Sequence, residues 1–189
     1  MKLQRRSAAP AIVTAALSLA ACTPGSGLTP VAEYKPDVYR LGGGDRIRVI
    51  TFGEEQLTGE FRVDDTGRIA LPLLGSVKAE GLTPEQLDGV IADGLTRRKL
   101  LRDPSVAVEV VAYRPVFVLG EVAKPGQYPY QPGMTMQTTV AVAGGYTYRG
   151  VQDYASVVRS NGGQATEGLV RPSSFVALGD VIKVYERRF

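Results

Sequence analysis

Residues 83–110, TPEQLDGVIADGLTRRKLLRDPSVAVEV, predict a helix followed by a strand, which places the chain among folds that mix both elements. Thr83 suits the helix N-cap, Pro84 suits the first turn, and Gln86 completes a capping box. The apolar residues that recur at helical spacing are Leu87, Val90, Ile91 and Leu95. Asp103 and Pro104 end this pattern, and the alternating valines that follow predict a strand.

The residues before this helix add short strands and turns to the same unit. Gly42–Asp45 predicts a turn, and Arg46–Phe52 then alternates basic and apolar residues, as in a strand with one buried face. The alternation over residues 61–71 has Asp64–Gly67 at its centre and predicts a hairpin. Residues 75–79 predict a further strand. We therefore expect a small α/β unit over residues 39–114.

Pro115 separates this unit from a second one, which we expect over residues 115–189. The strands predicted there cover residues 116–122, 127–130, 154–159 and 180–185, and a short helix covers residues 135–143. We expect the Asn161–Gly163 turn to lie between the last two strands. A small mixed sheet with one helix across it follows, so the whole chain is expected to be an α+β protein.

The first 22 residues carry the features of an export signal. Lys2, Arg5 and Arg6 precede a short apolar run, and Leu19-Ala20-Ala21-Cys22 resembles a lipobox, in which the cysteine is acylated and begins the mature protein. The alternative is an ordinary signal peptide with a cysteine just after the cut. The apolar run is shorter than the roughly 20 residues of a spanning helix. We expect residues 1–21 to be the signal peptide and residues 22–38 a flexible lipidated tether, with order beginning near Tyr39.

Composition excludes several kinds of function. The chain has 22 basic and 19 acidic residues, and loss of the three basic residues of the signal leaves the two charges equal. The basic excess therefore gives no reason to expect nucleic-acid binding. The chain contains no histidine and only one cysteine, Cys22, so a Cys/His metal site or a Ser-His-Asp triad cannot be built from it. We expect no catalytic residues, no metal and no cofactor.

Four motifs of the first unit occur in a defined order. They are Tyr39–Asp45, with the form Tyr-x-Leu-x-x-Gly-Asp, then Val63–Gly75, Gly81–Thr83 and Asp103–Val106. The second unit adds Gly120–Val122, Pro125–Gly126, Ala143–Gly145 and Gly179–Ile182. In this order and spacing the chain resembles the bacterial outer-membrane polysaccharide export lipoproteins, in which a polysaccharide export domain precedes a β-grasp domain of the SLBB type.

The resemblance implies a lipoprotein on the periplasmic face of the outer membrane, anchored through acyl chains on Cys22. It also implies a ring of identical subunits, an inner-membrane polysaccharide copolymerase as partner, and an exported polysaccharide as cargo. Thr23 agrees with outer-membrane sorting, since aspartate at that position commonly signals inner-membrane retention. Longer family members end in an amphipathic helix that forms a membrane pore. Residues 186–189 here follow a strand directly, so we expect a short member, for which passage across the outer membrane needs a partner channel or an unusual arrangement.

Arginines and tyrosines are the weak candidates for contact with the polysaccharide. Arg46 and Arg48, with Arg62 and Arg68, can share the polar face of the first sheet and meet acidic sugars or a neighbouring subunit, although a solvated face is the default interpretation. Tyrosine rings stack on sugars, but they also pack in cores and interfaces. The candidate tyrosines are Tyr128, Tyr130, Tyr146 and Tyr148.

Three functions compete at this level. The first is a non-enzymatic ring subunit of an exopolysaccharide or capsule export conduit. The second is a monomeric carbohydrate-binding periplasmic lipoprotein. The third is a glycan hydrolase that uses carboxylates such as Glu55 or Asp64. The third is disfavoured, because the neighbouring acidic residues at 54–55 and 64–65 point to opposite sides of an extended chain and do not form a two-carboxylate site.

Overall fold

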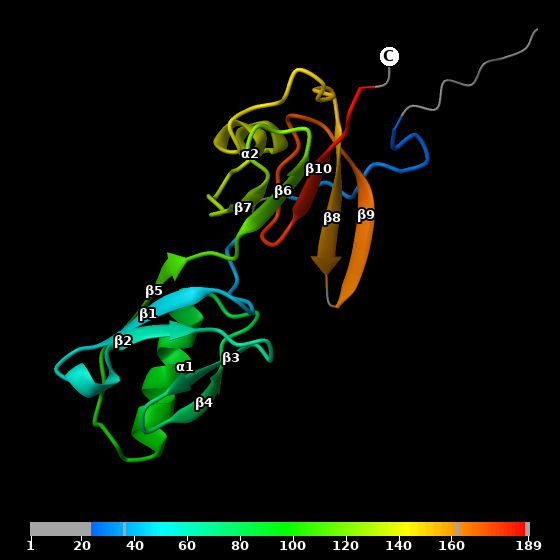
Figure 1. The fold of residues 1–189 in the computed structure, drawn as a ribbon. Helices are drawn as coiled ribbons and strands as arrows, with labels where there is room; N and C mark the ends of the chain where they lie inside the picture. Colours follow the sequence, from blue (N-terminus) through cyan, green and yellow to red (C-terminus); the bar gives the residue numbers. More distant parts are fainter. Residues whose placement is uncertain (1–23, 36, 162, 188–189) are drawn as a thin grey trace, which may run out of the picture.

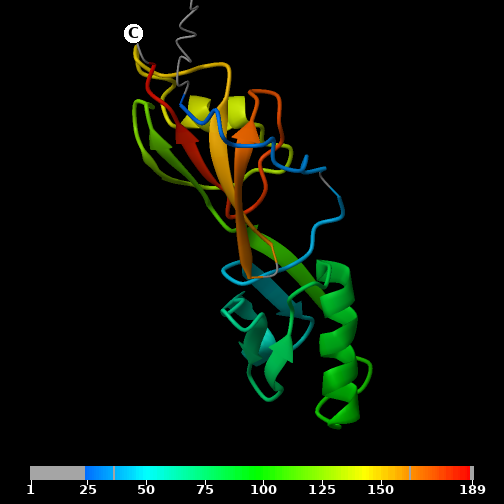
Figure 2. The same ribbon diagram turned by 90° about the vertical axis from the view of Figure 1, so that its right-hand side faces the viewer.

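The computed structural model describes residues 24–35, 37–161 and 163–187, and these residues form two units with separate buried cores (Figures 1 and 2). The predicted signal peptide and Cys22 lie outside the described residues. The first unit contains β1 (Arg46–Thr51), the short 3-10 helix η1 (Glu55–Leu57), β2 (Gly59–Arg62), β3 (Arg68–Leu71), β4 (Gly75–Lys78), α1 (Pro84–Arg97) and β5 (Val106–Ala112). Its three-stranded sheet has the order β2-β1-β5, and β3 and β4 form a separate pair.

Helix α1 confirms the prediction made from its capping residues. The amide of Gln86 donates to Thr83 Oγ1 at 3.2 Å, and the amide of Thr83 donates to Gln86 Oε1 at 3.0 Å. The residues that the helix buries are Leu87, Ile91 and Leu95. They pack in one cluster with Ile47 and Val49 of β1, so the helix covers one face of the three-stranded sheet. The other face, which carries Arg46 and Arg48, remains exposed.

The predicted hairpin over residues 61–71 is wrong in its strand pairing. The turn exists, since Gly67 has a positive φ of 74° and the amide of Asp64 donates to the carbonyl of Arg68 at 2.8 Å. Beyond it the two strands part, because β2 pairs with β1 and β3 pairs with β4. The amide of Val63 donates to the carbonyl of Asp45, which keeps the chain on β1 up to the turn.

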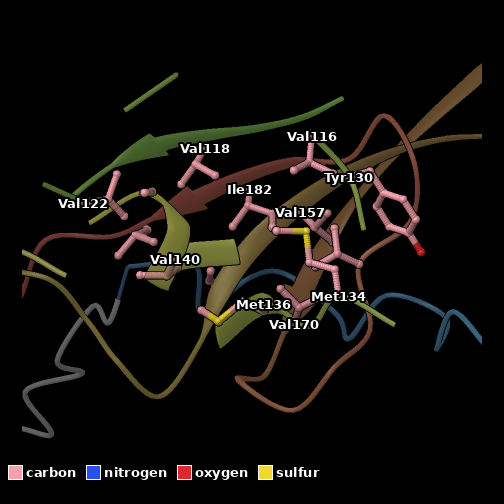
Figure 3. Close-up of a cluster of buried hydrophobic side chains, with 14 residues drawn as sticks. Val116, Val118, Val122, Tyr130, Met134, Met136, Val140, Val157, Val170 and Ile182 are labelled. Atoms are coloured by element: carbon pink, nitrogen blue, oxygen red, sulfur yellow. The ribbon is translucent and has the colours of Figure 1, made fainter. Parts of the chain in front are cut away.

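The second unit has a five-stranded sheet in the order β7-β6-β10-β8-β9. Its elements are β6 (Val116–Gly120), β7 (Gly126–Tyr128), α2 (Met136–Val142), β8 (Ala155–Asn161), β9 (Gln164–Val170) and β10 (Val181–Val184). Strands β6 and β10 are parallel and the other pairs are antiparallel. Figure 3 shows the core between this sheet and α2, where Met136 and Val140 meet Val118, Val157 and Ile182. The mixed α+β fold class is thus confirmed.

Strand β9 is an element that the sequence did not predict. Strand β8 ends at Asn161, which pairs with Gln164 at the start of β9, so β8 does not lead directly to the closing strand β10. Residues 164–167 are all exposed, so the first half of this strand lacks the alternation of apolar and polar residues that marks a half-buried strand.

The expectation that order begins near Tyr39 is wrong, because residues 24–35 run along the second unit. We call residues 24–35 the N-terminal strap. The amide of Val31 donates to the carbonyl of Leu169 at 3.1 Å, and the amide of Leu169 donates to the carbonyl of Thr29 at 2.9 Å. Val31 also packs against the core of the unit. The strap stays in place because it satisfies part of the open edge of β9.

Across the described ranges, neither helix has both the length and the apolar character that crossing a bilayer requires.

Candidate functional site at the junction of the two units

Two buried aspartates have the same local geometry in the two units. Asp45 directly precedes β1 and Asp180 directly precedes β10. Each carboxylate accepts a hydrogen bond from the amide three residues earlier, Gly42 at 2.7 Å and Ala177 at 2.8 Å. Each aspartate amide in turn donates to the carbonyl of that same residue at 3.2 Å. A reciprocal turn of this kind locks the loop that enters a central strand.

Asp45 also joins the first unit to the segment that leads into the second. Its Oδ1 accepts a hydrogen bond from the amide of Arg114 at 3.0 Å, and its carboxylate accepts another from the hydroxyl of Tyr39. The Arg114 guanidinium lies beside it, with Nε 3.4 Å from Oδ1. Burial, followed by the hydrogen bond to Asp45, raises the pKa of Tyr39 well above its usual value. Asp45 itself is fully buried. Through its hydrogen bonds with Tyr39 and Arg114 it ties both ends of the first unit together.

Asp180 holds a buried arginine in the second unit. Arg159 donates from Nε to Oδ1 at 3.0 Å and from Nη2 to Oδ2 at 2.8 Å, which is a two-point ion pair. Its Nη1 donates to the carbonyl of Ala32 at 3.0 Å, and its guanidinium lies 5.5 Å from the ring centre of Tyr34. Arg159 therefore fastens the N-terminal strap to the sheet.

Three tyrosine rings cross the junction in edge-to-face contact. The rings of Tyr39 and Tyr113 lie 4.8 Å apart at 88°, and those of Tyr113 and Tyr130 lie 6.0 Å apart at 74°. Tyr39 belongs to the entry of the first unit, Tyr113 follows β5, and Tyr130 lies in the core of the second unit. Burial, reinforced by the neighbouring Tyr34, raises the pKa of Tyr130 to about 12. The run connects the two cores through aromatic contacts.

A cavity of about 590 Å³ lies where the strap passes from one unit to the other. Arg40, Arg114 and Arg159 line it together with Tyr34 and Tyr39. Glu33 and Asp37 also line it, so its charge is mixed. Arg159 is occupied by Asp180, and Arg40 donates from Nη1 to the carbonyl of Gly81 at 2.9 Å. The remaining guanidinium donors of Arg40 and Arg114 are suited to a carboxylate or another anion.

The candidate arginines of the first sheet lie on its exposed face. Arg46 and Arg48 both bind Glu60, at 2.6 and 3.1 Å. Hydrogen bonds from these two arginines lower the pKa of Glu60. Arg62 lies opposite Arg46 across the β1–β2 pair, whereas Arg68 belongs to the other strand pair and binds Ser76. The face carries three arginines and one shared carboxylate, with Glu109 opposite Arg48 on β5.

The candidate tyrosines separate into three packed side chains and one exposed side chain. Tyr130 is buried, Tyr128 donates from its hydroxyl to the carbonyl of Lys124, and the Tyr146 hydroxyl lies 3.6 Å from the sulfur of Met136. Burial also raises the pKa of Tyr146. Tyr148, by contrast, is 85% exposed. Of the four, only Tyr148 offers its whole ring to a ligand or a surface.

One of the two acidic pairs lies in a turn and the other at the start of η1. Asp64 Oδ1 accepts hydrogen bonds from the amides of Thr66 and Arg68 and from the Thr66 hydroxyl, so it stabilises the turn. The hydrogen bond from the Thr66 side chain, more than any other contact, lowers the pKa of Asp64. Residues 54 and 55 begin η1 at the tip of the first unit. Within the described part of the chain, no cluster of three or more potential ligand side chains is placed to hold a metal ion.

Four residues whose contacts hold the junction and the strap were not among the predicted site residues. They are Asp45, Arg114, Arg159 and Asp180. A signal for the two aspartates is present in the sequence, since residues 44–49 and 179–184 both follow the pattern Gly-Asp-x-Ile-x-Val. No local pattern indicates the arginines, because Arg159 is 21 residues from Asp180 and Arg114 is 69 residues from Asp45.

Comparison with known proteins gives two adjacent matches. Residues 33–111 match the family described as polysaccharide biosynthesis/export protein, and residues 115–169 match the SLBB domain. The chain is 38% identical over 125 residues to the exopolysaccharide production protein ExoF of Rhizobium meliloti, covering 59% of this chain and 29% of that protein. It is 29% identical over 170 residues to the EPS I polysaccharide export outer membrane protein EpsA of Ralstonia nicotianae, covering 84% of this chain and 43% of that one.

A third similarity is to the polysialic acid transport protein KpsD of Escherichia coli, 32% identical over 97 residues, which are 50% of this chain and 17% of KpsD. The matched part of this chain thus spans less than half the length of each of these three relatives.

Proposed function

This chain belongs to the polysaccharide export family, and from that premise we propose that it serves the export of an exopolysaccharide or capsular polysaccharide as a structural component. The observation that carries the proposal is the order of the two matched regions, residues 33–111 followed by residues 115–169. The contacts of Asp45 and of the tyrosine rings join these two regions in the structure. In this proposal the chain handles the polymer without chemical change, in agreement with the role of Asp64 in a turn and of Asp180 in an ion pair.

The component acts as a ring of identical subunits around an aqueous lumen. A conduit for a hydrated sugar chain needs a passage of the right width and few strong contacts, since each tight contact slows transit. Exposed arginines paired with carboxylates, as on the β1–β2 face, suit weak contact of this kind. An inner-membrane copolymerase delivers the polymer to this ring.

The two units take their proposed limits from the sequence, with residues 39–114 as the export domain and 115–189 as the β-grasp domain. Cys22 carries acyl chains that hold the protein on the periplasmic face of the outer membrane. Cys22→Ala should remove the protein from the outer-membrane fraction while leaving its folded domains intact. A Cys22→Ala protein that still sediments with the outer membrane would show the anchor assignment to be wrong.

The central experiment is deletion of the gene and complementation with the wild-type chain. We expect deletion to abolish secretion of one extracellular polysaccharide. The polysaccharide that remains inside the cell should keep the same sugar composition. Light scattering of the detergent-extracted, lipidated protein should give a protein mass several times that of one subunit. Unaltered secretion of every polysaccharide by the deletion strain would overturn the proposal.

The cavity lined by Arg40 and Arg114 favours one second candidate, a monomeric lipoprotein that binds an acidic carbohydrate. Calorimetry with an oligosaccharide containing uronic acid distinguishes the two functions. A protein that stays monomeric at high concentration and loses sugar binding on Arg114→Met would support this second candidate. A protein that assembles and gives no heat of binding would support the ring.

A further inference from the structure

The start of the N-terminal strap is held at one end of the second unit. The hydroxyl of Tyr154 donates to the carbonyl of Pro24 at 2.9 Å, across 130 residues of chain. Gly25 lies so close to the ring of Tyr185 and the side chain of Leu169 that a Cβ atom there would be 3.1 Å from the ring. The described chain therefore begins at a defined place on the second unit.

Only Thr23 separates Pro24 from Cys22. Because successive Cα atoms are 3.8 Å apart, the Cα of Cys22 lies within about 7.6 Å of the Cα of Pro24 in any conformation. An acyl chain on Cys22 would thus hold this end of the second unit next to the lipid headgroups.

Other segments gather at the same end. The amide of Arg187 donates to the carbonyl of Arg149 at 2.8 Å, and the amide of Val151 donates to the carbonyl of Tyr185 at 2.9 Å. Both views show the loop between α2 and β8, the chain after β10 and the beginning of the strap together, at the end away from the first unit (Figures 1 and 2). We call Tyr148, Arg149, Tyr185 and Arg187 the anchor face.

Tyr148 gives this face its chemical character. It is 85% exposed, and Phe52 in the first unit, at 84%, is the other aromatic side chain of the described residues exposed to this degree. A tyrosine ring with a polar hydroxyl suits the boundary between headgroups and acyl chains. Arg149 and Arg187 flank it, although Arg149 is paired with Glu186 and Asp153 is also exposed nearby in the chain. The aromatic side chain, more than net charge, distinguishes the face.

We propose that the anchor face lies against the bilayer surface and that Tyr148 inserts among the lipid headgroups. This inference rests on the proposed acylation of Cys22 and goes beyond it, since acylation alone does not determine which residues touch the membrane. The first unit, with Phe52 directly after β1, then points away from the lipid (Figure 1).

The chain contains no tryptophan, so one introduced tryptophan reports on a single position. We would place the full lipidated protein in vesicles of phosphatidylethanolamine and phosphatidylglycerol, with either Tyr148→Trp or Phe52→Trp as the matched control. Tryptophan emission at position 148 should shift to shorter wavelength on insertion and lose intensity when the vesicles carry brominated acyl chains. Emission at position 52 should stay at the wavelength of a solvated indole and keep its intensity.

The outcomes separate this inference from the anchor on which it rests. If the protein floats with the vesicles while position 148 stays unquenched, the anchor holds and the proposed face is wrong. Quenching at both positions would show a molecule lying flat on the membrane and would also overturn it. If the protein does not float, the acylation itself is refuted and this inference falls with it. Circular dichroism of both variants checks that each is folded.

Discussion

At the scale of single residues, buried aspartates organise this protein. Asp45 and Asp180 each directly precede a central strand, each closes the preceding loop, and each lies beside an arginine from a distant part of the chain. Carboxylates in such positions accept hydrogen bonds that no apolar residue can replace. Their contribution is therefore measured best by removing one partner of each pair.

The Arg159–Asp180 pair gives the clearest prediction. Asp180→Ala leaves the guanidinium of Arg159 buried without its counter-charge and removes the acceptor of the Ala177 amide. We expect it to lower the free energy of unfolding by about 3–5 kcal/mol. Urea denaturation followed by circular dichroism measures the change. Glu186→Ala breaks the exposed pair with Arg149 and should cost less than about 1 kcal/mol, so equal losses would contradict the assignment.

Tyr130 predicts a dependence of stability on alkaline pH. Its pKa is raised from 10.0 to about 12, so the unfolded chain releases this proton at lower pH than the folded chain does. The corresponding stability is complete below pH 10 and is lost as pH rises toward 12. Tyr39, whose pKa is also raised, acts in the same direction.

We therefore expect the unfolding free energy of the wild-type chain to fall over this range, and to fall less steeply in Tyr130→Phe. Chemical denaturation at a series of alkaline pH values measures both slopes. Equal slopes would show that the Tyr130 phenol does not contribute.

At the scale of elements, the parallel pair of β6 and β10 depends on one glycine. Gly120 ends β6 with a φ of 85°, and a Cβ atom there would overlap the carbonyl oxygen of Val184. We expect Gly120→Ala to destabilise the protein by more than about 2 kcal/mol, because both the backbone angle and the space are unfavourable.

Gly126 provides the matched control for this substitution. It begins β7 and has no atom within 4 Å of a Cβ position. Gly126→Ala should change the unfolding free energy by no more than about 0.5 kcal/mol. Thermal unfolding of the two variants, compared at equal concentration, tests whether the effect belongs to the position or to loss of any glycine.

The elements also show how far sequence reasoning reaches. Helices α1 and α2 were both predicted, and for α1 the cap Thr83 and the apolar spacing are local features. Strand β9 was missed because its first four residues are exposed and its edge is completed by residues 29–31 from far away in the chain. The pairing of β2 with β1 likewise depends on contacts beyond the turn. Local signals predict elements, whereas strand partners depend on the whole fold.

The candidate site was less predictable than the fold. Alternation predicted the exposed face with Arg46 and Arg48, and the register places Arg62 on it too. The junction was not predicted, since its contacts join residues as far apart as Asp45 and Arg114. Burial of Tyr130 and exposure of Tyr148 were equally hidden, because both lie in irregular segments without a periodic pattern.

At the scale of the whole molecule, the first unit is inserted into the second. The chain runs along the second unit as the strap, forms the first unit, and returns at residues 113–115. Two stretches of chain therefore cross the junction, and Asp45 binds residues of both, Tyr39 and Arg114. Two crossings restrict hinge motion far more than a single linker does.

Asp45→Asn should loosen this junction more than it harms either core. An amide cannot accept all the hydrogen bonds of the carboxylate and does not neutralise Arg114, so we expect a loss of about 1–3 kcal/mol. Scanning calorimetry should resolve one unfolding transition in the wild-type chain and two in the variant. Asp65→Asn, at an exposed position in the neighbouring turn over residues 64–67, should keep a single transition. A single transition in both variants would show that Asp45 does not couple the units.

The strap also sets an order of events during synthesis. Pro24 emerges early from the ribosome, whereas Tyr154, which holds it, follows 130 residues later. Contacts of such large sequence separation form only after the intervening chain is available. The strap consequently stays unseated while most of the chain is being made, and it takes its place only when the last third of the polypeptide has arrived. Completion of the second unit is thus delayed until both ends of the chain are present.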